Sequence, residues 1–230
     1  MLVDRRGFGD SPAVDVDGWP TDVEDVAGLL NELGGAHLVG QSYGAVVSLL
    51  IAGGHPDLIG SLVAIEPPLY GIAVGDPVAD EAAGALRPVY DRAAELTAEE
   101  FVSAWGAALG MPGEAVRSWT ATFGGKEWAA AEASRRERWP GDAPIDLEAL
   151  TAAAFPKVVV RGGWRDDVAP GRGRAGEGFR VTCEAVAAAI GARIVVFEQS
   201  AHNPQLEEPE RFNALLRGVW AEAEALAQPG

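Results

Sequence analysis

The chain has few cysteines and histidines. It contains one cysteine, Cys183, and three histidines among 230 residues. A single thiol cannot form an internal disulfide, so the fold must depend on its apolar core. The sequence also contains no apolar stretch of the length that a bilayer span requires. We therefore expect neither a disulfide scaffold nor a membrane-spanning protein.

Basic residues are also scarce, with 18 Lys and Arg against 34 Asp and Glu and a formal net charge of -16. A phosphate backbone or an anionic membrane would be repelled by this charge. The opening residues Met1–Arg6 carry charges where a secretory signal peptide needs an apolar core. We expect a cytoplasmic protein that binds neither nucleic acid nor membrane, and nothing in the composition favours one oligomeric state.

What the sequence does contain is ordinary for a globular domain, with 48% hydrophobic and 23% charged residues. Short apolar runs typical of strands covered on both faces occur at 36–41, 61–65, 157–161 and 193–197. Segments with helical periodicity alternate with them at 23–33, 43–52, 179–190 and from Pro209 onward. This alternation predicts an α/β fold with a mostly parallel sheet flanked by helices.

The first of these helices has sequence signals at both ends. Thr21 is followed three residues later by Glu24, which is the pattern of a capping box and predicts a helix start. Gly34 follows the last periodic apolar residue and predicts the helix end.

The segment 70–150 differs from the rest, because it is rich in Ala, Glu and Arg and has no β-rich run. Thr97 and Glu100 form another capping-box pattern within it. We expect a helical insertion at 70–150 in a core made of 1–69 and 151–230. Four tryptophans of this segment favour helix packing, although several could line a pocket: Trp105, Trp119, Trp128 and Trp139.

Ser42 is the strongest candidate for a catalytic residue. It lies in Gly40-Gln41-Ser42-Tyr43-Gly44, between the apolar run that ends at Val39 and the one that starts at Ala45. A G-x-S-x-G between a strand and a helix forces a sharp turn that exposes the serine hydroxyl, and each glycine removes a Cβ where the backbones crowd. The pattern predicts a nucleophile at Ser42.

A serine hydroxyl needs a base, and His202 is the best placed of the three histidines. It follows the 193–197 strand by a few residues, in a loop where open α/β sheets collect functional groups. His37 lies inside a strand and His55 ends a helix before a proline, so we interpret both as structural.

A carboxylate is needed to orient the histidine, and the chain order Ser, acid, His places it between Ser42 and His202. Asp166 follows the 157–161 strand and is our first choice, with Asp167 second. Glu66, at the end of an earlier strand, is a third candidate, but the two prolines after it favour a structural carboxylate.

Three segments in this order resemble motifs of the α/β-hydrolase fold superfamily. They are Asp4–Ser11, similar to the D-x-R-G-x-G-x-S loop after the fourth strand, the elbow Gly40–Gly44, and Ser200–Pro204, similar to the Gly-x-x-His-x-Pro-like end. The resemblance implies that 70–150 is the helical cap inserted after the sixth strand, and that the Tyr43 N–H is an oxyanion donor. A serine nucleophile separates the chain from dehalogenases and epoxide hydrolases of the same fold, which carry Asp there.

The chain also departs from the pattern of the family it resembles. Family members carry about three strands and a His-Gly-type loop, which supplies the second oxyanion donor, before the segment that Asp4–Ser11 resembles. These first strands are absent here, because Met1 lies inside what resembles the fourth strand. We expect a start codon assigned too late or a shortened chain, with a minimal hydrolase as the alternative. The strand at 36–41 should then lack its usual neighbour.

The resemblance and the candidate residues together predict a serine hydrolase that cleaves a small ester, thioester or lactone through an acyl-enzyme. Ser42 attacks, His202 is the base, Asp166 orients it, and no metal or organic cofactor is needed. Carbon–carbon bond hydrolases and perhydrolase-like members use the same triad. The alternative from another class is a non-catalytic binding protein that lacks a full oxyanion hole.

Overall fold

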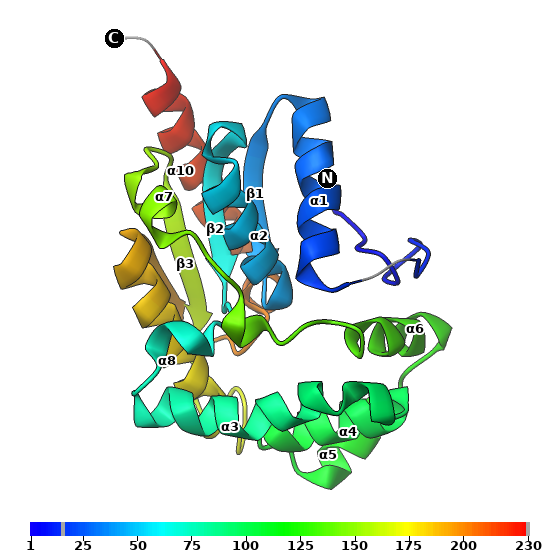
Figure 1. The fold of residues 1–230 in the computed structure, drawn as a ribbon. Helices are drawn as coiled ribbons and strands as arrows, with labels where there is room; N and C mark the ends of the chain where they lie inside the picture. Colours follow the sequence, from blue (N-terminus) through cyan, green and yellow to red (C-terminus); the bar gives the residue numbers. More distant parts are fainter. Residues whose placement is uncertain (15–16, 229–230) are drawn as a thin grey trace.

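The computed structural model of the chain describes residues 1–14 and 17–228. Its centre is a parallel four-stranded sheet in the order β1-β2-β3-β4, as Figure 1 shows. The strands are β1 (Ala36–Gln41), β2 (Ile59–Ile65), β3 (Lys157–Gly162) and β4 (Arg193–Phe197). All four coincide closely with the predicted apolar runs, so the predicted α/β fold with a parallel sheet is confirmed.

Helices surround the sheet and make up most of the remaining chain. The α-helices are α1 (Trp19–Leu33), α2 (Tyr43–Gly54), α3 (Pro77–Asp91), α4 (Ala98–Ala108), α5 (Gly113–Thr120), α6 (Gly125–Ser134), α7 (Leu147–Ala152), α8 (Gly173–Ile190), α9 (Pro204–Glu207) and α10 (Pro209–Ala227). Short 3-10 turns occupy Pro56–Leu58, Tyr70–Ala73, Ala93–Glu95 and Pro140–Asp142.

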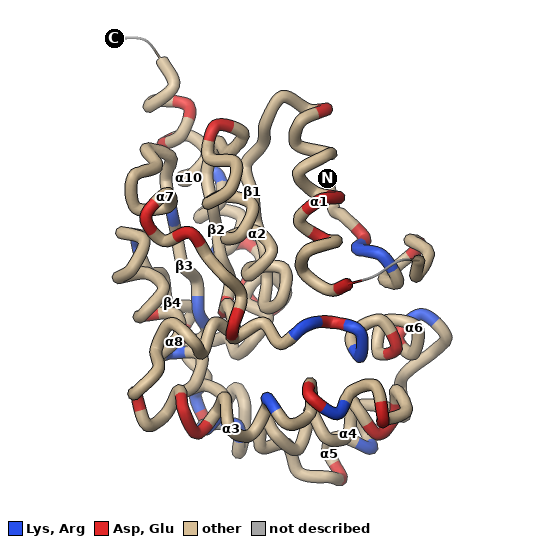
Figure 2. The backbone as a smooth tube through the Cα atoms, viewed as in Figure 1, with Lys and Arg blue, Asp and Glu red and all other residues tan. Residues whose placement is uncertain are grey.

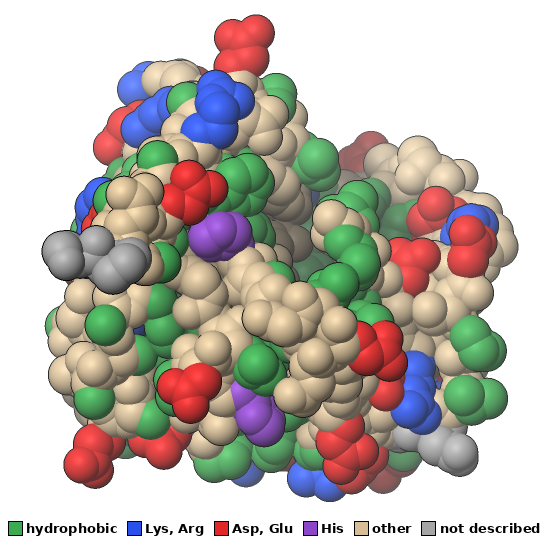
Figure 3. Space-filling view, turned by 90° about the horizontal axis from the view of Figure 1, so that it is seen from above, with side chains coloured by type: hydrophobic (Ala, Val, Ile, Leu, Met, Phe, Trp, Pro, Cys, Tyr) green, Lys and Arg blue, Asp and Glu red, His purple; other side chains and the backbone are tan. Residues whose placement is uncertain are grey.

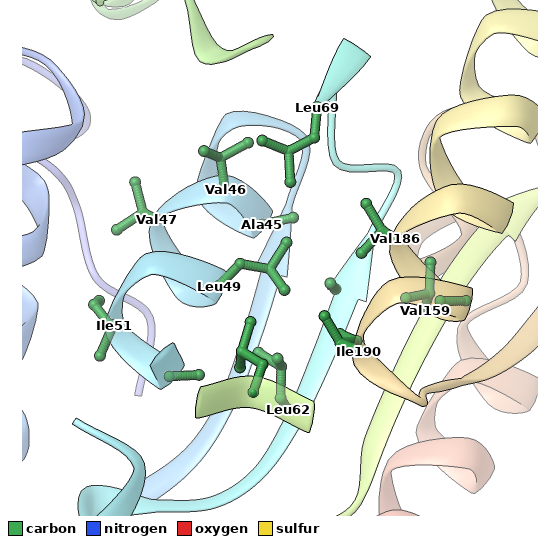
Figure 4. Close-up of a cluster of buried hydrophobic side chains, with 14 of the residues drawn as sticks. Ala45, Val46, Val47, Leu49, Ile51, Leu62, Leu69, Val159, Val186 and Ile190 are labelled. Carbon is green, nitrogen blue, oxygen red and sulfur yellow. The ribbon is translucent and has the colours of Figure 1, made fainter. Parts of the chain in front are cut away.

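The alternation of side chains along the central strands builds an apolar core on each face of the sheet. On one face, Leu62 and Val159 pack with α1, α2, α7 and α8, and Figure 4 shows side chains such as Leu49 and Ile190 converging there. On the other face, Val63 and its neighbours pack under α10. Central strands covered on both sides explain why they are apolar without interruption.

The ends of α1 agree only partly with the sequence signals. Gly34 ends the helix in the left-handed conformation at φ 72°, as predicted. The start is different, because α1 begins at Trp19 rather than after Thr21, whose hydroxyl accepts the Asp17 N–H at 3.0 Å. Pro20 favours this earlier first turn, since proline suits the first helical positions.

The segment between β2 and β3 is helical, as predicted, and its helices α3 to α6 lie below the carboxyl ends of the strands in Figure 1. The capping box between Thr97 and Glu100 is present at the start of α4. α3 joins the insertion to α8 through an apolar cluster around Tyr70 and Leu86. The expected boundary at residue 150 falls inside α7, which packs against α2 and α8.

The first five residues form no strand, although they resemble one by sequence. They lead into a loop that Asp4 closes: its carboxylate accepts the Asp10 N–H at 3.1 Å and its carbonyl accepts the Ser11 hydroxyl at 2.8 Å. Within residues 1–14 and 17–228, β1 pairs only with β2 and is therefore an edge strand. Val39 on this strand is 41% exposed.

Charged residues of both signs are distributed over the described part of the chain. Figure 2 shows acidic residues spread over the helices of both the sheet region and the insertion. On the face opposite the insertion, acidic, basic and apolar side chains are interspersed, as Figure 3 shows. Across the described part of the chain, no helix is both long enough and apolar enough to cross a membrane.

Candidate active site

Ser42 occupies a strained turn between β1 and α2. Its φ of 54° and ψ of -120° lie outside the regions that residues other than glycine normally adopt. The main chain there is fixed because the Ser42 N–H donates to the carbonyl of Ile65, at the end of β2, at 2.8 Å. This is the geometry of a nucleophile elbow, in which strain is held at a functional position.

The two glycines of the elbow are not equivalent. A Cβ at Gly40 would lie 2.2 Å from the Gly44 carbonyl oxygen and 2.4 Å from the Ser48 hydroxyl, so β1 and α2 could not approach as they do. A Cβ at Gly44 would meet nothing within 4 Å. The expectation that both glycines relieve crowding is therefore correct for Gly40 and wrong for Gly44.

His202 lies in the loop after β4 and contacts the carboxylate of Glu66. Its Nδ1 is 2.6 Å from Glu66 Oε2, and the side chains are 20% and 0% exposed. An ionised carboxylate can only accept a hydrogen bond, so the tautomer that suits this contact carries its proton on Nδ1. In the neutral ring, Nε2 is then left without a proton and can accept one from a hydroxyl.

Two further donors hold Glu66 in place. Its Oε1 accepts the Gly162 N–H at 2.8 Å and the Trp164 indole N–H at 2.7 Å. Both donors come from the end of β3, so the carboxylate links the ends of β2, β3 and the histidine loop. A fully buried carboxylate with three donors is satisfied, and its orientation toward His202 is fixed.

Within the described residues, positive φ outside glycine occurs at three positions, Ser42, Glu66 and Trp164. Ser42 and Glu66 immediately follow β1 and β2, and Trp164 lies two residues after β3. All three therefore lie at the same edge of the sheet. A positive φ outside glycine costs free energy that the surrounding structure must offset. Residues with such backbone strain cluster at functional sites. The strain marks this edge as the candidate site.

The structure corrects the expectation that Asp166 orients His202. The Asp166 carboxylate is exposed and accepts the Gly171 N–H at 3.3 Å, which closes its own turn. Asp167 forms an ion pair with Arg165 at 2.9 Å, and Arg165 lowers its pKa through a hydrogen bond. The chain after β3 presents the Trp164 indole to the site instead, and Glu66 occupies the position beside the imidazole.

The other two histidines lie away from this pair. His37 Nδ1 is 2.9 Å from the Ser61 hydroxyl and its ring stacks on Trp220 with centroids 5.7 Å apart. His55 ends α2, where its N–H donates to the Ile51 carbonyl at 2.8 Å. Both have contacts of the structural kind expected from the sequence.

Gln41, next to Ser42, connects the elbow to the histidine loop. Its Nε2 donates to the His202 carbonyl at 3.1 Å and to Asn203 Oδ1 at 3.3 Å. The imidazole also packs against Phe179 with ring centroids 4.7 Å apart. The loop after β4 therefore reaches across the sheet edge to the end of β1, and the sequence motif gave no signal for this role of Gln41.

The oxyanion donor expected at Tyr43 is the first residue of α2. The first main-chain N–H groups of a helix have no acceptor within that helix. The Tyr43 N–H therefore makes no hydrogen bond inside α2. The Tyr43 side chain is occupied elsewhere, because its hydroxyl accepts the Trp19 N–H at 2.8 Å. Its ring is buried, and burial raises the pKa of its phenol.

A cavity of about 580 Å³ opens beside the elbow, between the sheet edge and the insertion. Its lining includes Ser42 and Tyr43 together with Trp105 and Trp119 of the insertion. Trp128 instead packs against Phe123, and Trp139 packs against Tyr90. The tryptophans thus divide between the two roles that the sequence left open.

Two charged residues of this cavity were not identified from the sequence. Arg5 donates to Glu137 Oε1 at 2.6 Å and to Asp22 Oδ2 at 2.8 Å, and both Arg5 and Glu137 line the cavity. Burial raises the pKa of Glu137 to about 7, against the opposing attraction of Arg5. Burial acts to lower the pKa of Arg5, but the two carboxylates outweigh it and raise that pKa.

No group of three or more His, Cys, Asp or Glu side chains in residues 1–14 and 17–228 is arranged to hold a metal ion. The polar groups of the site include the elbow serine, the histidine–carboxylate pair and the ion pairs of Arg5.

A strained serine between a strand and a helix, beside a histidine–carboxylate pair at the carboxyl edge of a parallel sheet, defines the α/β-hydrolase class. The chain belongs to the Alpha/beta hydrolase family, whose model matches residues 1–215. The resemblance inferred from the three sequence motifs is confirmed.

Solved structures show the same fold. MenH from S. aureus is 17% identical with a TM-score of 0.62, and the match covers 95% of this chain and 81% of that one. An α/β hydrolase from Sphaerobacter thermophilus is 25% identical with a TM-score of 0.59, covering 86% and 74%. A thermophilic esterase from Thermogutta terrifontis is 24% identical with a TM-score of 0.56, covering 95% and 78%. A comparison with curated proteins gave no match.

Proposed function

We propose that the protein is a serine hydrolase that cleaves an ester, thioester or lactone of a small molecule. Ser42 is the nucleophile, His202 the general base, and Glu66 the carboxylate that orients the histidine. The order Ser42, Glu66, His202 along the chain follows the order of triads in this fold. Glu66 takes the role that the sequence favoured for Asp166.

The observation that supports this proposal best is the contact of 2.6 Å between His202 Nδ1 and Glu66 Oε2. A buried carboxylate fixes the tautomer of the imidazole and stabilises the imidazolium that forms during the reaction. The loop that carries His202 also contacts Gln41, the residue before the strained Ser42, which brings the histidine to the end of β1.

The proposed reaction has two stages. His202 Nε2 takes the proton of Ser42 as its oxygen attacks the substrate carbonyl, and the Tyr43 N–H donates to the developing oxyanion. The imidazolium then gives that proton to the leaving oxygen or sulfur, and an acyl-enzyme remains on Ser42. Water, deprotonated by the same imidazole, releases the acid and restores the serine.

The cavity supports a small-molecule substrate. Its volume of about 580 Å³ lies within the range of roughly 300–1,000 Å³ that is usual for ligand pockets. It reaches from the elbow into the aromatic side of the insertion. A neighbour of similar fold is described as an esterase, which supports ester hydrolysis as the first reaction to test.

Covalent labelling tests the nucleophile directly. Treatment with a fluorophosphonate should add one phosphonyl group, detected by intact-mass spectrometry, and Ser42→Ala should abolish it. Ser48→Ala is the matched control, because Ser48 lies on α2 behind the elbow and its variant should label like the parent. An unlabelled parent protein would favour a non-catalytic binding protein, and labelling that persists in Ser42→Ala would refute this nucleophile.

A further inference from the structure

The walls of the cavity beside Ser42 are unusually aromatic. Its lining contains five aromatic side chains from the insertion: Tyr90, Phe101, Trp105, Trp119 and Phe123. Trp119 lies at the centre of this set, with its ring 6.5 Å from that of Trp105 and 5.0 Å from that of Phe123. The Trp119 residue is 41% exposed, so aromatic surface is left for a ligand.

The formal charge of the cavity lining, with all its carboxylates ionised, is negative. Arg5, Glu127 and Glu137 are the charged residues of the lining, which is one cation against two carboxylates. Glu127 stays ionised because main-chain N–H groups, its own and that of Gly124, lower its pKa. Arg5 is shared with Asp22, so its charge is divided between two acids. The acids therefore outnumber the base.

Glu137 is the buried carboxylate of this lining. Its side chain is 7% exposed, and its hydrogen bond from Arg5 is the one that the structure shows for it. Burial raises its pKa to about 7 despite that bond. A second cation beside it would offset the cost of burying its charge.

Arg5 itself does not provide a site for an anionic substrate. Its Nη1 donates to Asp22 and its Nη2 to Glu137, so the two ends of the guanidinium fork are occupied. Its face is covered as well, since the guanidinium lies 4.2 Å from the Phe8 ring centre and 4.8 Å from that of Tyr43. An incoming carboxylate would have to displace one of these acids.

We propose that this cavity binds a positively charged organic group of the substrate, a quaternary or protonated amine, against Trp119 and near Glu137. Aromatic faces attract cations through the ring quadrupole, and the neighbouring carboxylate supplies the opposite charge. The inference rests on the proposed hydrolase function and specifies its substrate class: an ester, thioester or lactone that carries a cation on the part lying under the insertion.

Binding to the Ser42→Ala protein tests the inference separately from turnover. Isothermal calorimetry would compare choline with its neutral isostere 3,3-dimethylbutan-1-ol, and butylammonium with butan-1-ol. Cation–aromatic attraction of about 0.5–2 kcal/mol predicts that each cation binds roughly 2- to 30-fold more tightly than its neutral partner. If choline alone binds more tightly than its neutral isostere, the site prefers a quaternary group. If butylammonium alone does so, the site prefers a protonated amine.

Two variants in the Ser42→Ala background locate the site. Trp119→Leu and Glu137→Gln should each reduce the preference for the cation several-fold, and Trp119 is exposed enough that its replacement leaves the fold intact. Glu222→Gln, on α10 and paired with Arg193 at 3.6 Å, is the matched acidic control and should leave the preference unchanged. Equal affinity for cations and isosteres, or a preference that survives in both Trp119→Leu and Glu137→Gln, would overturn the inference. Absence of fluorophosphonate labelling in the parent would instead count against the hydrolase proposal.

Discussion

Nδ1 of His202 lies 2.6 Å from Oε2 of Glu66, although 136 residues separate them in the chain. The carboxylate has no exposed surface and its other oxygen accepts two more N–H groups. The contact therefore joins the loop after β4 to a buried side chain at the end of β2.

Replacing Glu66 with Gln should lower kcat by about 10⁴-fold with little change in KM, because the amide favours the wrong imidazole tautomer. Gln keeps the volume and one acceptor oxygen, so the fold should persist, as circular dichroism would show. Steady-state hydrolysis of a chromogenic ester measures the effect. Asp166→Asn is the matched control and should stay within about twofold of the parent, since exposed groups away from the site contribute little. A large loss of kcat in Asp166→Asn, with little change in Glu66→Gln, would instead assign the orientation of His202 to Asp166.

His202→Ala should lower kcat by about 10⁴-fold or more, because the serine loses its general base. His55→Ala, at the end of α2, should retain full turnover. His37→Ala should affect the free energy of unfolding rather than kcat, since it loses contacts with Ser61 and Trp220. Thermal denaturation and ester hydrolysis on the same preparations separate these outcomes. A folded but inactive His55→Ala protein would contradict the assignment of the base.

Gln41 is predicted to act as a positioning residue for the histidine loop. Gln41→Leu removes both hydrogen bonds to the loop, at His202 and Asn203, and should lower kcat about tenfold while KM changes little. Gln199→Leu, on the same loop but exposed, is the control and should leave kcat unchanged. Comparable kcat values for the parent and Gln41→Leu would show that the loop holds its position without this contact.

The sheet and the elbow could be predicted from the sequence because their signals are local. A parallel strand buried on both faces contains a continuous apolar run, as the two central strands β2 and β3 do. Shorter apolar runs mark β1 and β4, which lie at the two edges of the sheet. The candidate nucleophile is marked by glycine and serine within five consecutive residues. His202 could be predicted from its distance to the preceding strand.

The carboxylate could not be chosen in this way, because its role depends on contacts distant in the chain. Glu66 turns toward His202 through a φ of 45° and is held by Gly162 and Trp164, 96 and 98 residues away. Asp166 and Asp167 had the expected spacing after a strand, but the turn they occupy faces solvent. The Arg5–Glu137 pair spans 132 residues and has no local signature either.

The two elbow glycines allow a matched test of backbone crowding. Gly40→Ala should lower the free energy of unfolding by about 1–3 kcal/mol or more, since its methyl would overlap main-chain and side-chain atoms of α2. Gly44→Ala should be neutral or stabilise the protein by up to about 1 kcal/mol, because alanine is the better helix former and no atom lies within 4 Å. Urea denaturation measures both. Equal destabilisation by the two substitutions would contradict the difference between these positions.

Glu137 joins the insertion to the amino-terminal segment through Arg5, and its ionisation should therefore affect folding. Its pKa is about 7 in the folded protein, against 4.5 for an ordinary glutamate, because burial outweighs the attraction of Arg5. At pH values between 4.5 and about 7, Glu137 therefore holds its proton more tightly in the folded protein than in the unfolded chain. The free energy of unfolding that this group contributes is thus fully present below about pH 4.5 and is lost as the pH rises through about 7.

Glu137→Gln should remove this pH dependence, because glutamine does not titrate. At about 1.4 kcal/mol per pKa unit, the difference in free energy of unfolding between parent and variant should fall by about 1–3 kcal/mol from pH 5 to pH 8. Urea denaturation at intervals of half a pH unit measures it, and above pH 8 the difference should become constant. Glu222→Gln, whose side chain is 49% exposed, should follow the parent throughout. If the parent and Glu137→Gln curves ran parallel from pH 5 to pH 8, Glu137 would not carry the raised pKa.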